Sequence, residues 1–344
     1  MDEINIAMIN DCSFVGENII KYLPSEFKVH HCRRSRGFFD KTFGVLGRVY
    51  KAKGDVFHVH FALQDAYLTC RFKKKKQVIV HAHGSDVRST IRSKKWGWMT
   101  RYSIEHATRL LVSAPDVLEK ARQLRPDVIY IPIPVDLAQF TVKQPVEHDK
   151  VVLFHPYLNE SRGTQVVIHA FSFLQKKHPE KFMLRLLGKP DNYVRWLLQN
   201  LNLKDVELIE SVEHEKMVSL YQQADVIISD MRYGAMPTTS IEAMACGKPL
   251  VQYIKPAVYG DEIEFPPVFA VKETTPVALF DVLDQFVNDV PRSSEYRRYV
   301  EKNHNAKRVA KTIGTIYHEV VPYSCKDEVK IITMEPEEVK FIES

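Results

Sequence analysis

The sequence predicts an α/β protein made of two doubly wound, Rossmann-like domains that face each other across a cleft. Two observations lead to this prediction. A length of 344 residues is long for one hydrophobic core, so two domains are the default expectation. Short apolar runs also alternate with helix-like segments, as in parallel sheets covered on both faces. The pattern restarts after a polar segment at 132–150 that contains three prolines, as expected of a linker.

The elements follow in order along the chain. In the first half we expect strands at 4–10, 55–61, 77–83, 109–114 and 128–133, and helices around 18–23, 62–73, 90–107 and 115–123. In the second half we expect strands at 151–156, 182–188, 206–210, 225–230 and 249–254, and helices at 163–177, 191–201, 214–223, 238–246 and 274–289. A further helical stretch is expected at 294–321. The predicted domains are therefore 1–140, 141–322 with its closing helices, and a charged tail at 323–344.

The composition indicates a soluble protein without a membrane span, a signal peptide or a disulfide framework. No run of about 18 apolar residues occurs, so no membrane span is expected. The acidic N-terminus enters a strand directly and does not resemble a signal peptide. Five scattered cysteines indicate free thiols in a reducing cytoplasm. Residues 1–150 hold 25 Lys/Arg against 16 Asp/Glu, whereas the remainder holds 23 against 27, so an anionic partner should meet the first half.

Four motifs define the order of functional segments. They are HAHGSD at the end of the 77–83 strand, VSAPDVLEKARQLRPDVIYIPIPVDLAQF, LFHPYLNESRGTQVVIHAF and ADVIISDMRYGAMPTTSIEAMACGKPLV. In this order they resemble retaining glycosyltransferases of the GT-B fold, most closely family 4, over roughly residues 50–320. The SIEAMACGKPLV block is the most specific part. The resemblance implies a nucleoside diphosphate sugar donor (a UDP- or GDP-sugar above all) held by the second domain, an acceptor held by the first, no cofactor and no essential metal.

Glu242 is the centre of the donor site that this resemblance implies. The matching glutamate of the family accepts both ribose hydroxyls, although a carboxylate that stabilises a helix N-terminus is the alternative. Free N–H groups at that helix start favour phosphate oxygens. Arg162-Gly163 matches the basic-Gly pair that reaches the pyrophosphate, with a surface arginine capping a loop as the alternative. The residues assigned to donor binding are Arg162, Gly163, Gly188, Glu210, Val212, Gly234, Ala235, Met236, Ser240 and Glu242.

Two positions depart from the family pattern. The second basic residue that the family usually shows after the first strand of this domain is replaced by His155-Pro156, which replaces it only in part. Eight residues before Glu242, where the family usually carries a glutamate beside the transferred sugar, this chain has Gly234. We expect a different contact to the sugar here rather than a loss of catalysis, because the other donor features persist and glycine lets backbone amides approach.

The HAHGSD motif supplies the candidate catalytic residues. In the family, a histidine at the end of this strand contacts the transferred sugar, and we assign this role to His83. The implied reaction passes through an oxocarbenium-like state in which the donor's own phosphate helps to deprotonate the acceptor, so His83 would act by hydrogen bonding and electrostatics. Asp86 is expected to orient the turn or to contact the acceptor. The alternative interpretation is that His83 is a structural residue whose hydrogen bonds are all made inside the fold.

Paired histidines also raise the alternative of a zinc site. His58 and His60, like His81 and His83, are spaced i, i+2, so each pair shares one strand face. Neither a cysteine nor a cluster of carboxylates accompanies them in the usual way. We therefore predict no metal.

The segments 71–76 and 88–101 are basic, and the second contains five Lys/Arg beside two tryptophans. Aromatic and cationic side chains together suit an anionic membrane surface, and the resemblance places a membrane or lipid-linked acceptor on this face. The residues assigned to the acceptor or membrane side are Lys73, Lys74, Lys75, Lys76, Lys94, Lys95, Trp96 and Trp98. A solvated basic surface with core tryptophans is the alternative. No nucleic acid is expected, because no nucleic-acid-reading motif accompanies the charge.

Taken together, the sequence predicts a cytoplasmic, metal-independent glycosyltransferase of the hexosyltransferase type with a glycan or lipid-linked acceptor, in the latter case peripheral at the inner face of the membrane. Two alternatives remain open. A nucleotide-sugar epimerase of GT-B fold would share both domains and need no acceptor. A non-catalytic relative would bind nucleotide-sugar and have lost the chemistry.

Overall fold

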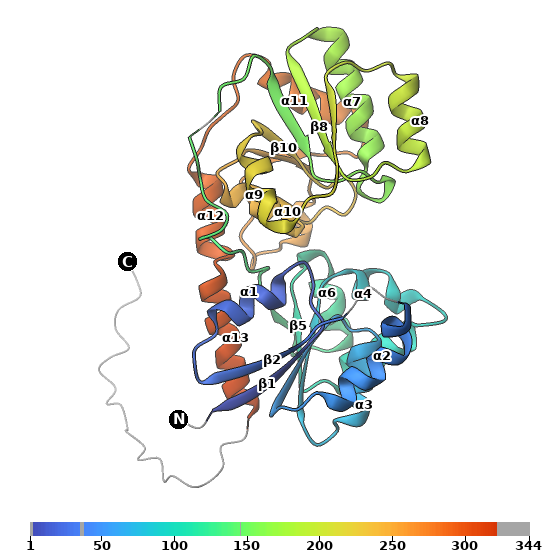
Figure 1. Ribbon diagram of the computed structural model, residues 1–344, viewed down its shortest axis with the longest axis vertical. Helices are drawn as coiled ribbons and strands as arrows, with labels where there is room; N and C mark the ends of the chain where they lie inside the picture. The colour runs from blue at the N-terminus through green and yellow to red at the C-terminus, as the bar shows by residue number, and fades with distance from the viewer. Residues whose placement is uncertain (1–2, 35–37, 145, 322–344) are drawn as a thin grey trace, which may run out of the picture.

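The computed structural model describes residues 3–34, 38–144 and 146–321, which form two α/β domains stacked one on the other (Figure 1). The tail at 323–344, including Cys325, lies outside these residues. Among the described helices, none has both the length and the apolar character that a membrane span requires. The cysteines of the described part, Cys12, Cys32, Cys70 and Cys246, are free thiols.

The first domain is built on a parallel sheet with the order β2-β1-β3-β4-β5-β6. Its strands are β1 Ile4–Ile9, β2 Phe27–Cys32, β3 Val56–His60, β4 Gln77–Ala82, β5 Arg109–Val112 and β6 Ile129–Tyr130. Its helices are α1 Val15–Tyr22, α2 Phe38–Lys51, α3 Gln64–Phe72, α4 Ser85–Arg88, the 3₁₀ turn η1 Thr90–Arg92, α5 Gly97–His106 and α6 Pro115–Leu124. The chain order reverses between β1 and β3. Ligands bind beside such a switch point, at the carboxyl ends of the strands.

The second domain repeats the plan with the order β12-β11-β10-β7-β8-β9, also parallel. Its strands are β7 Val151–His155, β8 Phe182–Leu187, β9 Val206–Ile209, β10 Val226–Ile228, β11 Leu250–Tyr253 and β12 Phe269–Val271. Its helices and 3₁₀ turns are η2 Glu160–Arg162, α7 Thr164–Lys177, α8 Asn192–Asn200, α9 His214–Gln222, α10 Thr238–Ala245, η3 Pro256–Val258, α11 Pro276–Leu283, η4 Asp284–Phe286 and α12 Glu295–Asn303. Here the switch point lies between β7 and β10.

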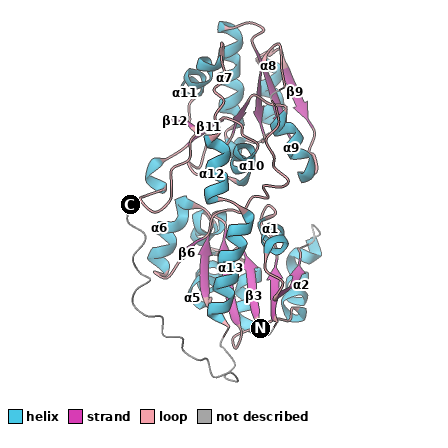
Figure 2. Cartoon of the chain, turned by 90° about the vertical axis from the view of Figure 1, so that its left-hand side faces the viewer, coloured by secondary structure: helices cyan, strands magenta, loops and turns pink. Residues whose placement is uncertain are grey.

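The last helix returns to the first domain. Whereas α12 packs on α10, α13 (Ala306–Val320) lies against the first sheet, as Figure 2 shows. Its residues Val309, Ile313 and Tyr317 join one apolar cluster with residues of β1, β3, β4 and β5. We expected all residues up to 322 to close the second domain, and this helix is where the structure differs. The chain therefore passes between the domains twice.

Besides short single turns such as α4 and η2, two strands and one longer helix were not predicted. Strand β2, with the sequence FKVHHC, lies at the edge of its sheet, and only its first and last residues are buried. Helix α2 contains two glycines, which weaken a helical pattern, and β12 has only three residues. The single helix expected at 294–321 is divided at His304-Asn305, because the Asn305 side chain accepts a hydrogen bond from Lys307 N and starts a new helix.

Candidate functional site

The backbone at the switch point of the first sheet is strained. Asn10, Ser13 and Phe14 follow β1 and Phe61 follows β3, and all four have positive φ angles between 48° and 68°. Such angles are costly for residues other than glycine and cluster at functional sites. The Asp11 carboxylate holds the β1–α1 loop by accepting hydrogen bonds from Cys12 N, Gly16 N and Glu17 N. The loops at the carboxyl end of the first sheet are therefore held in a defined conformation, and they face the second domain.

His83 lies at this end, just after β4, and is half-buried. Its Nε2 is 2.8 Å from His60 Nδ1, whereas His60 Nε2 is buried without a hydrogen-bond partner among the described residues. Because unpaired buried N–H groups are rarer than unpaired acceptors, we infer that His60 carries its proton on Nδ1 and donates to His83. His83 then carries its own proton on Nδ1. Burial lowers the pKa of His83 to about 3, so the imidazole is neutral at pH 7.

Asp86 has a different role from the catalytic one that we considered. Its side chain is fully buried. Its two oxygens accept hydrogen bonds from the backbone N–H groups of Ala62, His83, Gly84 and Val87. The carboxylate therefore fixes the turn that carries His83 and joins it to the end of β3. It orients the turn, which is one of our two expectations, and a contact to an acceptor stays a prediction.

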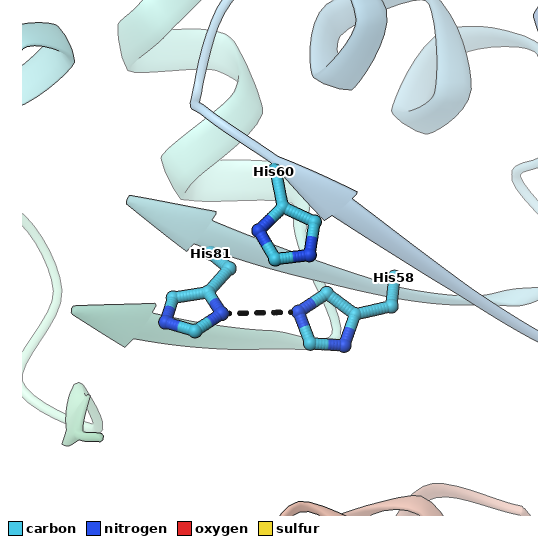
Figure 3. Close-up of side chains that lie close together, drawn as sticks. All are labelled: His58, His60 and His81. Atoms are coloured by element: carbon cyan, nitrogen blue, oxygen red, sulfur yellow. Dashed lines mark hydrogen bonds between the residues drawn. The ribbon is translucent and has the colours of Figure 1, made fainter. Parts of the chain in front are cut away.

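Four histidines occupy neighbouring positions at the ends of β3 and β4, and Figure 3 shows His58, His60 and His81. His58 Nε2 and His81 Nδ1 are 3.1 Å apart and hydrogen-bonded. This chain of hydrogen bonds continues to the Tyr317 hydroxyl on α13 at 2.6 Å and to Ser113 Oγ at 2.7 Å. Burial holds the pKa of all three imidazoles well below the usual value. They are neutral at pH 7.

The same three residues meet one requirement of a metal site, since one nitrogen from each lies within 4.8 Å of the others. Ligands of one ion must also direct their lone pairs to a single point. Here both ring nitrogens of His58 and of His81 are already engaged, with each other, with the Tyr317 hydroxyl and with Ser113 Oγ. The arrangement fits a hydrogen-bonded core network better than a preformed site. That the protein needs no metal stays a prediction.

In the second domain, Arg162 and Gly163 follow β7 beside the switch point. Gly163 has φ of 80°, and a Cβ there would come within 2.7 Å of Met231 Cβ, so a side chain does not fit. The Arg162 guanidinium donates to the buried carboxylate of Asp230, which follows β10. It also lies over the rings of Tyr157 and Tyr233, at 5.1 and 5.2 Å from their centroids. These contacts hold the arginine at the place where a diphosphate is expected.

Glu242 is buried in the middle of α10, as the fifth of its eight residues. Its Oε1 accepts from His214 Nε2 at 2.6 Å and its Oε2 from the Tyr221 hydroxyl at 3.1 Å. The His214 ring is stacked on Phe14 of the first domain, with centroids 3.7 Å apart and planes at 5°. The predicted ribose carboxylate is thus held by two donors, one of which contacts the facing domain.

Several residues assigned to the donor near α10 are already engaged. The Ser240 hydroxyl is buried and bonded to Ser229 Oγ and Gln252 Oε1, and the Ser240 N–H that we expected to face a phosphate donates to Pro237 O. The Met236 N–H donates to the Tyr259 hydroxyl, which removes it from the amides open to phosphate. The side chains of Ala235 and Met236 belong to the core. Fewer amides are available at this helix start than we expected.

The backbone conformation at position 234 explains why this residue is a glycine. Its φ is 78°, and an added Cβ would lie 2.7 Å from Lys255 Cγ. A glutamate at this position would therefore strain the backbone and displace the Lys255 side chain, so the missing carboxylate cannot be restored by substitution alone. The neighbouring acid, Asp230, is used by Arg162.

The remaining donor-side residues lie at strand ends. Gly188 follows β8 with φ of 124°, while exposed Glu210 and half-buried Val212 follow β9. His155 at the end of β7 is fully buried, with both ring nitrogens bonded to Ile228 O and Thr164 Oγ1. Burial lowers the pKa of His155 to about 4, so it is neutral and does not replace the missing basic residue even in part.

The two domains touch through side chains in the middle of the cleft. Besides the Phe14–His214 stack, Arg88 from α4 lies over the ring of Tyr233, 4.6 Å from its centroid. A cavity of about 420 Å³ lies on one side of these contacts and includes Phe14, Lys21 and His214 in its lining. Another of about 280 Å³ lies between α6 and the loop after η3. The donor-side groups thus stand in contact with the first domain.

The basic segments form two exposed groups in the first domain. Lys74, Lys75 and Lys76 are exposed beyond the C-terminus of α3, whereas Lys73 is turned inward and donates to Tyr50 O and Ala52 O. In the second segment Lys94, Lys95, Trp96 and Trp98 are exposed, and the Trp98 ring contacts Tyr67 of α3 edge to face. The exposed fractions of 42% for Trp96 and 54% for Trp98 exclude the alternative of core tryptophans.

Sequence reasoning did not identify five residues that shape this site: Phe14, Arg88, Tyr157, His214 and Tyr233. Each of them acts through a partner more than 25 residues away along the chain. Only the basic character of the 88–101 segment pointed toward one of them, Arg88.

Comparisons with known proteins agree with this geometry. Residues 138–307 match the family model of glycosyl transferases group 1. The mannosylfructose-phosphate synthase of Agrobacterium fabrum is 30% identical over 112 residues, which are 30% of this chain and 25% of that protein. The curated relatives are matched over only 25% to 47% of their own length.

Among solved structures, Anabaena HepE in complex with UDP-glucose superposes with a TM-score of 0.72 at 12% identity, over 92% of this chain and 100% of that chain. The sucrose-phosphate synthase of Thermosynechococcus elongatus gives 0.69 at 17% identity, over 92% and 99%. The chain therefore has the GT-B fold of two facing Rossmann-like domains, and its second half carries a group 1 glycosyl transferase domain.

Proposed function

We propose that this chain is a retaining, metal-independent glycosyltransferase of the family 4 type, which moves a hexose from a nucleoside diphosphate sugar to an acceptor on the first domain. The observation that supports this most strongly is that α10, which carries Glu242, and Arg162 are joined by Tyr157, whose hydroxyl is bonded to Thr239 of α10 and whose ring lies under the guanidinium. A buried carboxylate is placed for ribose hydroxyls, and a guanidinium held over two tyrosine rings is placed for a diphosphate.

The facing residues fit the chemistry of transfer. In this proposal Arg162 stabilises the charge that develops on the leaving diphosphate. His83, neutral and with its proton on Nδ1, donates a hydrogen bond to the sugar as positive charge builds at the anomeric carbon. The leaving phosphate takes the proton of the acceptor hydroxyl. Asp86 and His60 hold His83 in place for this step.

The proposed donor is a UDP- or GDP-sugar, with UDP supported by the UDP-glucose complex of the structural neighbour HepE. The experiment that tests the function is a calorimetric screen of the protein with UDP-, GDP-, ADP- and dTDP-sugars in the presence of EDTA. We expect one of the first two to bind, and the bound donor to undergo slow hydrolysis with release of the α-anomer. Binding that requires a divalent metal would contradict the proposed metal independence.

Analysis of the released products by NMR separates this function from its rivals. An altered nucleotide-sugar formed without any acceptor would identify an epimerase. Binding without hydrolysis, epimerisation or transfer to any tested glycan or lipid-linked acceptor would identify a non-catalytic binding protein.

We further propose that the surface formed by Lys94, Lys95, Trp96 and Trp98 binds an anionic membrane on the cytoplasmic side and so brings a lipid-linked acceptor to the cleft. Two exposed indoles beside two lysines match the interfacial region of a bilayer.

Vesicle co-sedimentation tests this surface. The protein should bind vesicles that contain phosphatidylglycerol and not vesicles of phosphatidylcholine alone. Reversing both lysines to glutamate should weaken binding by about 30-fold or more, since each surface lysine contributes roughly 1 kcal/mol. Trp98→Ser should also weaken binding, whereas Trp196→Ser, which removes an equally exposed indole on α8, should not. Equal binding to both kinds of vesicle would contradict the proposal.

A further inference from the structure

The diphosphate site of the second domain contains less positive charge than its ligand requires, if the proposed function holds. Arg162 is paired with the buried carboxylate of Asp230, so the two charges largely balance. His155, in the place of the family's second basic residue, is buried, neutral and fully hydrogen-bonded. A nucleoside diphosphate brings at least two negative charges, and burying them needs further cationic partners.

Arg88 of the first domain approaches this site from across the cleft. It ends α4, one turn after His83, and its side chain folds back over Gly84. A Cβ at Gly84 would lie 2.9 Å from Arg88 Nη2, so the glycine makes room for this conformation. Asp116 holds the guanidinium through Nε at 2.6 Å and Nη2 at 2.7 Å. The arginine is thus fixed in direction before any ligand binds.

Tyr233 brings Arg88 and Arg162 together. The two guanidinium carbons lie 4.6 and 5.2 Å from the centroid of the same ring, and therefore no more than 9.8 Å from each other. Tyr233 directly precedes Gly234, within the segment that the family uses for the donor. Each guanidinium is held by a carboxylate, Arg88 by Asp116 and Arg162 by Asp230. An anion bound beside this ring could accept hydrogen bonds from both guanidinium groups.

Arg88 also has donors to spare. Its bonds to Asp116 use Nε and Nη2, and no hydrogen bond within the described ranges uses Nη1. A guanidinium presents five N–H groups in a fixed plane. Arg88 can therefore keep Asp116 and donate to a phosphate oxygen at the same time.

We propose that Arg88 is a second diphosphate-binding residue, supplied by the first domain in place of the basic residue that the second domain lacks. The diphosphate site is then complete only when the two domains meet. The acceptor domain in this way takes part in binding the donor.

Calorimetry with nucleoside mono- and diphosphates tests this role, with the base that the wild-type protein binds. Arg88→Gln should weaken the diphosphate, UDP or GDP, by about 10- to 100-fold, as expected for the loss of a hydrogen bond to a charged group. The monophosphate, UMP or GMP, should weaken by only a few fold. Arg88→Lys should lie between Arg88→Gln and wild type, because it keeps the charge and loses the planar donor set.

Two controls separate binding from folding. Arg92→Gln removes an exposed arginine from the neighbouring turn and should leave both affinities unchanged. Arg88→Gln with Asp116→Asn replaces the ion pair by two amides, so that the carboxylate is not left alone, and should bind as Arg88→Gln does.

The outcomes that contradict the proposal are distinct. Wild-type protein that binds no nucleoside diphosphate would overturn the proposed function and this inference together. Wild-type binding with equal losses for mono- and diphosphate in Arg88→Gln, or with no loss, would overturn the inference alone.

Discussion

Replacing Glu242 with alanine is expected to weaken binding of the nucleoside diphosphate by roughly 30- to 1000-fold. The proposed ribose contact consists of two charge-assisted hydrogen bonds, and their loss costs about 2–4 kcal/mol. In the structure both carboxylate oxygens already accept hydrogen bonds, from His214 and Tyr221. The carboxylate is thus held in one orientation before the ribose arrives. Titration calorimetry with UDP and GDP measures the loss.

Stability must be measured beside affinity, because alanine also leaves the Tyr221 hydroxyl without its acceptor inside the protein. Thermal unfolding of each variant shows whether it is folded at the temperature of the titration. Glu242→Gln keeps an acceptor for Tyr221 and should still lose most of the affinity. Glu213→Ala, at an exposed carboxylate next to His214, is the matched control. Unchanged affinity in folded Glu242→Ala would remove this residue from the donor site.

His83→Ala is expected to lower the rate of transfer, or of donor hydrolysis, by about 100-fold or more while nucleotide affinity changes by no more than a few fold. One hydrogen bond made in the transition state and not in the ground state has this effect. Because burial lowers the pKa of His83 to about 3, the imidazole is neutral from pH 5 to pH 9. Its protonation should not contribute to the pH dependence of the rate in that range, and only more acidic solutions would charge it.

Single-turnover kinetics of donor hydrolysis and calorimetry on the same variant separate the two effects. His106→Ala, at an exposed histidine on α5, serves as the control. A collapse of nucleotide binding in His83→Ala, or transfer at the wild-type rate, would show that this histidine is part of the structural network and takes no part in the reaction.

The sequence was sufficient for the architecture because both sheets consist mainly of buried strands with continuous apolar runs. Edge elements were harder to predict. Most residues of strand β2, with the sequence FKVHHC, are at least partly exposed to solvent. Its polar residues interrupt the apolar run by which the other strands were recognised. The sequence also did not show which domain α13 packs against, because its apolar face could cover either sheet. The structure shows that Ile313 and Tyr317 pack against the first sheet.

Within the candidate site, the sequence predicted where the residues lie in the fold better than it predicted which groups are free to bind a ligand. The motif order located Arg162 between β7 and α7 and Glu242 within α10, where the structure has them. Whether a group remains available for a ligand depends on distant partners. The Ser240 hydroxyl is hydrogen-bonded to Gln252, the Met236 N–H to Tyr259, and the His155 ring to Ile228 O. Gln252 and Tyr259 lie outside the quoted motifs, and Ile228 acts through its backbone oxygen, whose partner no motif reveals. The contacts of Arg88 and Phe14 link two separate domains.

The return of the chain to the first domain limits how the molecule can open. The two crossing segments are joined by hydrogen bonds, Val135 N to His304 O at 2.8 Å and Ala306 N to Val135 O at 3.1 Å. We expect this paired crossing to act as a hinge about which the domains swing, because it fixes the two crossing segments to each other at one place. On opening, the swing separates Phe14 from His214 and Arg88 from Tyr233, contacts worth about 0.5–1.5 kcal/mol each. Arg122 and Glu262 add one exposed ion pair across the domains, which contributes little. We therefore expect the closed state to be held weakly, so that a donor that bridges the domains can decide between the two states.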